Sequence, residues 1–445
     1  MTLHRSDPEP TDAAPRSDRS FDGDVLESLV MGDEEPSPRP GTARAAFAHR
    51  DFRRMWIGSF GSNIGSWMQQ VVLASYAFRL TGSAAFVGLL GFAQLGPLML
   101  LSIPGGVVAD MVDRRRWLVG LQTAMALLSL GLAALVAGAG DPPLAALFAL
   151  VLGIGIANAL NAPAWSAVVP KLVPARDLPG AISLNSTMIN GTRVIGPAIG
   201  GLLYPLLGPA WIFVINAATF AFIIGALLTI RFPVIPRATE TGWRRVSAGF
   251  RAAREDRVVG RLLLVLPVFS FFCLPFVSLF AALAEIDLGM NSKSLAYGLL
   301  YAAFGLGAAA GSLAVGTILA RVDKRLLVRF GFLGFAATLL AFGLLRAPAP
   351  AYPVVFALGA CYFGTTTSML TIVQMRVDDA VRARVMALWF MGFGGTVPIG
   401  GLVFGPLLDA TDGTVVLAVG AAVAVGLSFA ADLRRLEPGR VAVVG

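Results

Sequence analysis

A series of long apolar runs constrains the fold of this chain more than any other feature. A membrane-spanning helix needs about 20 mostly apolar residues, and about twelve runs reach that length. They lie at 55–79, 84–108, 116–139, 143–167, 179–206, 209–231, 261–284, 294–319, 326–345, 351–374, 385–409 and 413–432. Lipid cannot form hydrogen bonds with the backbone N–H and C=O groups, so a spanning segment must satisfy them within a helix or a closed barrel. The runs are too long for the strands of a barrel. We therefore predict an all-α membrane protein with twelve transmembrane helices.

The composition fits a chain that lies mostly in a bilayer. Hydrophobic residues make up 56% of the 445 positions and charged residues only 14%, whereas soluble domains carry about 25% charged residues. The formal net charge is +8, but basic clusters beside apolar spans mark the cytoplasmic face of a membrane rather than a nucleic-acid site. We expect a lipid bilayer as the surroundings, no nucleic-acid partner and no obligate protein partner.

Residues that bind metals or carry out catalysis are scarce in the apolar runs. Cys273 and Cys361 lie singly within runs, and the two histidines are His4 and His49. This spacing excludes a zinc or iron site and a disulfide framework. Asp, Glu and His are missing from the middle of every run, so a membrane-embedded enzyme would lack its nucleophile and base. We expect no metal, no cofactor and no enzymatic activity.

The distribution of lysine and arginine predicts the orientation in the membrane. With both termini in the cytoplasm, the outer loops and helix ends hold only Arg79, Lys293 and Arg346, and almost every other basic residue falls inside. Cytoplasmic loops characteristically carry this excess of Lys and Arg. We predict a multi-pass protein of the cell membrane with cytoplasmic N- and C-termini.

The polar segments divide the chain into five parts. We expect a disordered cytoplasmic tail over 1–50, a six-helix bundle over 51–231, a cytoplasmic loop over 232–260, a second six-helix bundle over 261–432 and a cytoplasmic tail over 433–445. Trp243 and Phe250 recur at helical spacing in the loop, so it either lies along the membrane surface or is a solvated linker.

A weak internal repeat relates the two halves. Gly106 and Asp113 recur as Gly316 and Asp323 at a constant offset, and the basic residues that follow recur with them. Two matched halves of six spans are typical of secondary transporters.

The stretch "GGVVADMVDRRRW", residues 105–117, places charge between two apolar runs. Gly106 permits close helix packing, and Asp110 on the last turn can reach a helix N-terminus or an arginine across the interface of the halves. Arg114 and Arg115 can pair with carboxylates while staying in water, so the contact can form in one state and break in another. We interpret the motif as a cytoplasmic gate; the alternative is that its arginines only determine topology.

These residues resemble the signature of the major facilitator superfamily, Gly-x-x-x-Asp-x-x-x-Arg-Arg. The stretches 52–90, 193–203, 297–313 and 382–389 are similar to the branch that includes enterobactin exporters and drug efflux pumps. The resemblance implies two pseudo-symmetric six-helix bundles, the major facilitator fold, and transport by alternating access. Ala320 stands where Asp110 stands in the first half, which implies an asymmetric gate.

Arg193 is the one basic residue predicted to lie mid-membrane. An arginine there costs about 2.5–3.5 kcal/mol and usually faces a cavity or a partner. We expect it to bind an anionic group of the substrate or to gate the pathway; the alternative is a fixed strut bonded to carbonyls and amides. Further candidates for the substrate cavity are Asn63, Trp67, Gln69, Asn158 and Asn190, with Tyr76, Phe272, Phe276 and Trp389 as apolar walls.

The stretch "RVIGPAIGGLL" resembles a fifth-helix motif of superfamily exporters. Gly196 and Gly200 form a small face for close packing with Gly201 beside it, and Pro197 removes one backbone hydrogen bond and bends the helix. The alternative is ordinary transmembrane packing, because such glycine pairs are common.

The chain has no phosphate-binding loop, so transport draws on an ion gradient or runs downhill. The resemblance implies proton coupling, for which the candidate carboxylates are Asp110, Glu285, Asp287 and Asp409. We predict a secondary active transporter that exports a small amphiphilic or anionic compound, such as an antibiotic, siderophore or toxic metabolite, by alternating access in antiport with protons. The alternatives are an importer or facilitator on the same fold and, from another class, a membrane-embedded enzyme or sensor.

Overall fold

The computed structural model describes residues 41–138, 141–168, 171–231, 255–377 and 379–432, almost all of them helical. The first half contains α2 (Ala43–Ala48), α3 (Arg50–Thr81), α4 (Ala84–Met111), α5 (Arg114–Ala137), α6 (Leu144–Val168), the short 3-10 helix η2 (Ala175–Asp177) and α7 (Leu178–Thr229). The second half contains α9 (Arg257–Cys273), α10 (Pro275–Ser278), α11 (Phe280–Ile286), α12 (Leu295–Gly316), α13 (Lys324–Leu344), α14 (Pro348–Arg376), α15 (Asp379–Ala410) and α16 (Gly413–Ala430).

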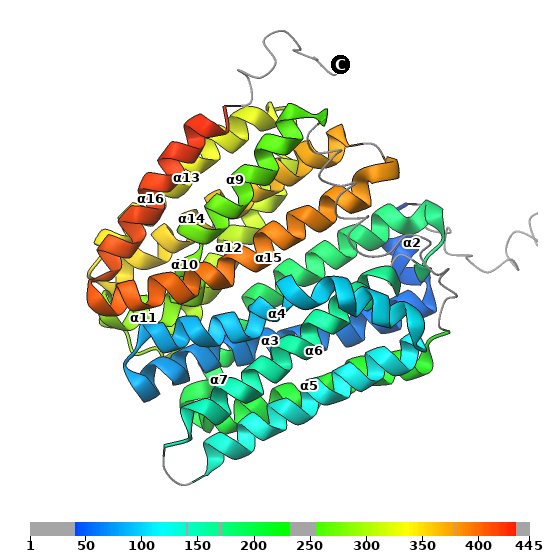
Figure 1. Ribbon diagram of the computed structural model, residues 1–445, viewed down its shortest axis with the longest axis horizontal. Helices are drawn as coiled ribbons and strands as arrows, with labels where there is room; N and C mark the ends of the chain where they lie inside the picture. Colours follow the sequence, from blue (N-terminus) through cyan, green and yellow to red (C-terminus); the bar gives the residue numbers. More distant parts are fainter. Residues whose placement is uncertain (1–40, 139–140, 169–170, 232–254, 378, 433–445) are drawn as a thin grey trace, which may run out of the picture.

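The two halves form two helical bundles (Figure 1), the first drawn in blue to green and the second in green to red. Glycines let their backbones touch where the bundles meet. A Cβ on Gly88 of α4 would lie 2.2 Å from the carbonyl oxygen of Gly401 in α15, and one on Gly201 of α7 would lie 2.3 Å from the Cα of Gly298 in α12. The all-α fold predicted from the apolar runs is confirmed.

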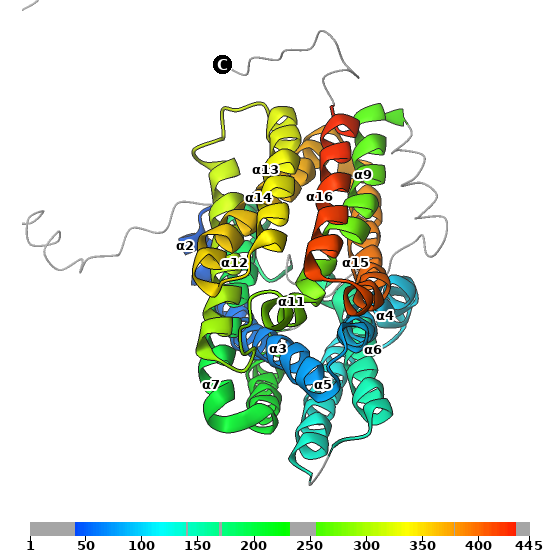
Figure 2. The same ribbon diagram turned by 90° about the vertical axis from the view of Figure 1, so that its left-hand side faces the viewer.

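One end of the bundle is closed by contacts between the halves, and we call it the closed end. It carries Arg79 and Ser83 of the first half and Glu285, Asn291 and Asp409 of the second, which bond across the interface. Figure 2 views the molecule from this end, with α3, α4, α11 and α15 near its centre. Towards the other end, which we call the open end, the two bundles diverge (Figure 1).

The predicted span limits are corrected at several points. Residues 43–48 form α2, inside the segment expected to be a disordered tail, because Gly41 and His49 on either side of it both bond Asp177. Helix α9 begins at Arg257 within the expected 232–260 loop, because Asp256 caps its first turn. Residues 1–40, 232–254 and 433–445, on which the other tail and loop predictions fall, lie outside the described part.

Two runs differ from simple straight spans. The fifth and sixth form one element, α7, whose backbone leaves the helical region at Gly208, with φ 76°. The seventh run is broken into α9, α10 and α11, where Pro275 begins α10. Proline cannot donate the backbone hydrogen bond that a continuing helix requires.

Within the described residues, nine helical segments are long and apolar enough to cross a membrane. Helix α3 is not among them, since polar side chains such as Asn63 and Gln70 interrupt its apolar sequence. The number twelve and the cytoplasmic position of the termini stay predictions.

Candidate functional site

A central cavity of about 360 Å³ lies between the two halves. That volume is in the range of small-molecule sites. The first half contributes residues from α3, α4, α5, α6 and α7, and the second from α10, α12, α14 and α15. Five of the six residues predicted for the substrate cavity line it: Asn63, Trp67, Gln69, Asn158 and Arg193.

Arg193 sits between aromatic rings from both halves. Its guanidinium carbon lies 5.3 Å from the ring centroid of Trp67 in α3 and 4.8 Å from that of Phe363 in α14. Its Nε is buried and makes no hydrogen bond, and the described residues place no carboxylate against it. A fixed strut would bond carbonyls or amides, and no such bond from Arg193 occurs within the described part. The side chain is therefore held by cation–π contacts.

The amide side chains of Gln69 and Asn63 differ in whether they are available to bind a ligand in the cavity. Gln69 is 4% exposed, and its Oε1 accepts a hydrogen bond of 2.8 Å from Nδ2 of Asn216. Asn63 donates to the carbonyl oxygen of Ser59 one turn earlier, at 2.8 Å. Gln69 thus joins α3 to α7, and Asn63 keeps its amide oxygen for the cavity.

The prediction for Asn190 is wrong. Its side chain is exposed and donates to the carbonyl oxygen of Ser186 at 3.0 Å, and it is not among the cavity-lining residues. Asn190 lies about one turn nearer the start of α7 than Arg193, and its amide bonds the backbone of its own helix.

The aromatic wall comes from residues that the sequence analysis missed. None of the four predicted wall residues, Tyr76, Phe272, Phe276 and Trp389, lines the cavity. Phe276, for example, is 1% exposed and packs edge-on against Phe304. The observed wall consists of Tyr301, Phe304, Tyr362 and Phe363. The signal available in the sequence was the series Tyr301, Phe304 and Ala308, which falls on one face of a helix.

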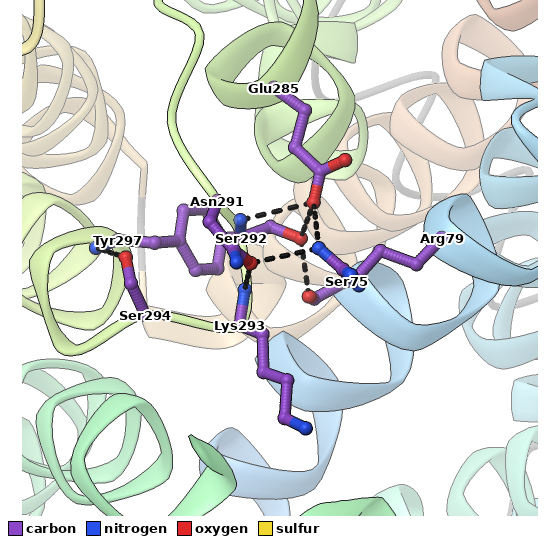
Figure 3. A network of polar contacts seen from close by, with 8 residues as sticks. All are labelled: Ser75, Arg79, Glu285, Asn291, Ser292, Lys293, Ser294 and Tyr297. Atoms are coloured by element: carbon purple, nitrogen blue, oxygen red, sulfur yellow. Dashed lines mark hydrogen bonds and ion pairs between the residues drawn. The ribbon is translucent and has the colours of Figure 1, made fainter.

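Polar contacts between the halves gather at the closed end (Figure 3). Arg79 of α3 donates to Oδ1 of Asn291 at 2.8 Å and lies 3.4 Å from Oε1 of Glu285. The same Glu285 oxygen accepts the backbone N–H of Ser292 at 3.0 Å and its hydroxyl. Ser75 of α3 bonds the Ser292 hydroxyl at 2.5 Å. Glu285 thereby organises a network that ties α3 to the loop after α11.

Asp409 caps a helix of the opposite half. It lies on the last turn of α15 and accepts hydrogen bonds from the backbone N–H groups of Ala84 at 2.6 Å and Ala85 at 2.9 Å and from the Ser83 hydroxyl at 2.7 Å. These N–H groups open α4 and have no partner inside their own helix. A carboxylate at a helix N-terminus also interacts favourably with the helix dipole.

Asp287 differs from these two carboxylates in being 9% exposed and packed against Gly413 at the closed end. Burial raises the pKa of the Asp287 carboxyl, and the nearby Arg346 offsets that rise only in part.

The match to known proteins places the chain in a family. The sequence model of the transmembrane secretion effector family, a branch of the major facilitator superfamily, matches residues 41–439. The chain belongs to this family. It is 29% identical over 353 residues to the enterobactin exporter EntS of Escherichia coli O1:K1 / APEC, a match that covers 78% of this chain and 80% of that protein. The corresponding exporter of Shigella boydii serotype 4 is 28% identical over 344 residues, covering 77% and 81%.

Solved structures show the same fold. The nucleoside transporter NupG aligns with a TM-score of 0.65 at 16% identity, over 86% of this chain and 98% of that one. A bacterial homolog of the human lysosomal transporter Spinster, in its inward-facing and occupied conformation, aligns with a TM-score of 0.63 at 17% identity, over 86% and 95%. The transmembrane secretion effector described here is thus a multi-pass membrane transporter and not an enzyme.

The superfamily gate motif is only partly described. Gly106 and Asp110 lie in α4, but their surroundings fall outside the described part. Arg115 donates to the carbonyl oxygen of Ile230 in its own half. The repeated Asp113 and Asp323 have a shared role, because each accepts a backbone N–H at the start of the third helix of its half. A gate across the halves at Asp110 and Arg114 stays a prediction.

The glycine motif of α7 packs closely on two sides. A Cβ on Gly196 would lie 2.6 Å from the Cβ of Trp67 in α3, and Gly200 lies against Met68, also in α3. Gly201 faces the other half. The backbone stays helical through Pro197, and the bend there stays a prediction.

Proposed function

We propose that this transporter exports a small amphiphilic or anionic compound by alternating access. The observation that carries the proposal is Arg193, an arginine without a carboxylate partner in a cavity lined by both halves. Its terminal nitrogens provide the cation for an anionic group, and Trp67, Tyr301 and Phe363 provide an apolar and aromatic wall. A substrate held by both halves is carried when they rock.

The direction of transport follows from the expected orientation and the relatives. The closed end carries Arg79 and Lys293, which the positive-inside rule assigns to the outside. In that orientation the cavity is sealed from the exterior and loads from the cytoplasmic side. The export named for the relatives supports the same direction. An importer or facilitator on this fold is the second candidate.

Proton antiport is the energy source we propose. Glu285 and Asp409 each bond groups of the first half at the closed end. A proton on either carboxyl removes a charge that holds the halves together, so protonation from outside favours opening there. Asp110 and Asp287 remain further candidates.

The test is export of a catecholate siderophore from a bacterial host that lacks its own exporter, followed as catechol in the medium. We expect the wild-type chain to restore export and Arg193→Ala to lower it at least tenfold, since about 1.4 kcal/mol of lost anion binding gives that factor. Asn190→Ala, on the same helix but outside the cavity, is the matched control. If Arg193→Ala exports the siderophore as fast as the wild type does, Arg193 does not bind an anionic group of the substrate. Accumulation of the siderophore in the cells would favour the importer.

A further inference from the structure

A second cavity lies at the open end, outside the pathway between the halves. Its volume is about 450 Å³, and it is bounded by the start of α3 and the end of α7. The residues lining it are His49, Arg50, Asp51, Arg54, Leu172, Thr229 and Arg231. Arg50 begins α3, and Arg231 follows the end of α7. Both lie at the ends of predicted membrane spans, so we expect the cavity at the level of lipid headgroups.

The charge of this cavity is strongly positive. Three arginines face one carboxylate, Asp51, which accepts the backbone N–H of Arg231 at 3.2 Å. Arg54 uses one nitrogen to bond the carbonyl oxygen of Thr229 at 3.1 Å. The side chains of Arg50 and Arg231 make no hydrogen bond or ion pair with any residue that the structure describes. Several free guanidinium donors around one space suit the oxygens of a phosphate group.

Exposed apolar residues continue from the arginines along the same face of the protein, and we call Ile57, Gly61 and Phe222 the apolar strip. Arg50, Arg54, Ile57 and Gly61 follow one another at helical spacing on α3. Ile57 is 54% exposed, and Gly61 lies against the ring of Phe222 in α7, which is itself 61% exposed.

This face points away from the substrate cavity. Asn63, Trp67 and Gln70, which line that cavity, lie on the opposite side of α3, since each residue turns the helix by about 100°. Gly225 of α7 is also uncovered, since an added Cβ would meet no atom within 4 Å. A ligand with an anionic head and an apolar tail matches the arginines and the apolar strip together.

We propose that this cavity and the apolar strip form a binding site for an anionic phospholipid. The phosphate contacts Arg50, Arg54 and Arg231, and an acyl chain lies along Ile57, Gly61 and Phe222. The chain segment that follows Arg231 does not complement the site, because residues 232–254 contain five arginines and one glutamate. The site is separate from the export pathway and does not rest on the proposed substrate.

The experiment is native mass spectrometry of the delipidated protein titrated with dioleoyl phosphatidylglycerol. Each arginine near a membrane surface is worth about a fivefold change in affinity, so replacing all three of Arg50, Arg54 and Arg231 by glutamine should weaken lipid retention about a hundredfold. Arg261→Gln, at an exposed arginine of α9 at the same end, is the control and should retain lipid as the wild type does.

Two further binding measurements distinguish a lipid ligand from a free phosphate compound. Ile57→Gln should weaken phosphatidylglycerol binding while leaving the arginines in place, and glycerol 1-phosphate, which has no tail, should bind far more weakly than the lipid. The proposal is overturned if the triple variant retains lipid as the wild type does, if phosphatidylcholine binds equally well, or if glycerol 1-phosphate matches the lipid. Monodisperse elution of each variant shows that it is folded.

Discussion

Arg193 is a buried cation whose cost is offset in part by contacts with aromatic rings. Burying a guanidinium without a carboxylate is costly, and rings 5.3 and 4.8 Å away supply part of the compensation. One ring comes from each half, so the environment of the cation changes whenever the halves move apart. Substrate affinity at Arg193 is therefore expected to differ between the two states of the transporter.

At the same scale, Asp287 gives a prediction about stability. Burial raises the pKa of this carboxyl, so the fold favours its neutral form, and the stability that this residue contributes falls as pH rises through its folded pKa. Asp287→Asn keeps a neutral group of similar shape and should raise the Tm at pH 8.

The measurement is thermal unfolding in detergent at pH 8 and at pH 5. The gain from Asp287→Asn should shrink at the lower pH, where the wild-type carboxyl is itself more protonated. Asp412→Asn is the control, at an exposed cap of α16 that accepts the N–H of Val415 at 2.9 Å. It should leave the Tm nearly unchanged, because asparagine caps a helix about as well as aspartate. An equal gain at both pH values would contradict the role of burial at Asp287.

At the scale of elements, the contact of α7 with α12 depends on two glycines. The Cβ of an alanine at position 201 would lie 2.3 Å from the Cα of Gly298, which the two backbones cannot accept without separating. Gly201→Ala should therefore weaken the closed end and shift the protein towards the state that is open there.

Labelling of a cysteine introduced as Ser278→Cys measures this shift. Ser278 lines a cavity of about 40 Å³ between the halves, towards the closed end. Labelling by a water-soluble maleimide should rise several-fold in Gly201→Ala. Gly191→Ala on the same helix, where a Cβ meets no atom within 4 Å, should leave the labelling rate unchanged. Equal rates in the two variants would show that the glycine contact does not control closure.

The cap that α15 places on α4 belongs to the same scale. Asp409→Ala removes three hydrogen bonds between the halves, and loss of a helix cap costs about 1 kcal/mol. We expect about a fivefold shift towards the state open at this end, read out by the same Ser278→Cys labelling. Asp409→Asn keeps an acceptor oxygen and should shift this equilibrium less than Asp409→Ala does. An unchanged labelling rate in Asp409→Ala would show that the Asp409 cap does not contribute to closure.

At the scale of the whole molecule, the contacts described between the halves at the closed end make opening there a collective event. If protonation of Glu285 or Asp409 assists it, an imposed pH gradient, acidic on the closed-end side, should accelerate substrate release on that side in proteoliposomes. Glu285→Gln with Asp409→Asn should largely abolish that acceleration while leaving downhill exchange. If the rate of substrate release by the wild type does not depend on the pH gradient, proton coupling is excluded.

Much of this architecture was predictable because lipid imposes strict rules on sequence. The length of the apolar runs determined an all-α membrane protein, and the missing carboxylates made Arg193 a candidate for the cavity. The division into halves followed from the long polar segment between them. Periodicity along single helices also supported the close packing of Gly196 and Gly200.

What only the tertiary structure decided was which faces of different helices meet. The aromatic wall of Tyr301, Phe304 and Phe363, the exclusion of Asn190, and the cap of Asp409 on α4 each depend on helices distant in the chain. Sequence periodicity assigns a residue to a face of its own helix, but the neighbour of that face is set by packing between helices. The break of the seventh run and the anchoring of α2 by Asp177 are likewise products of long-range contacts.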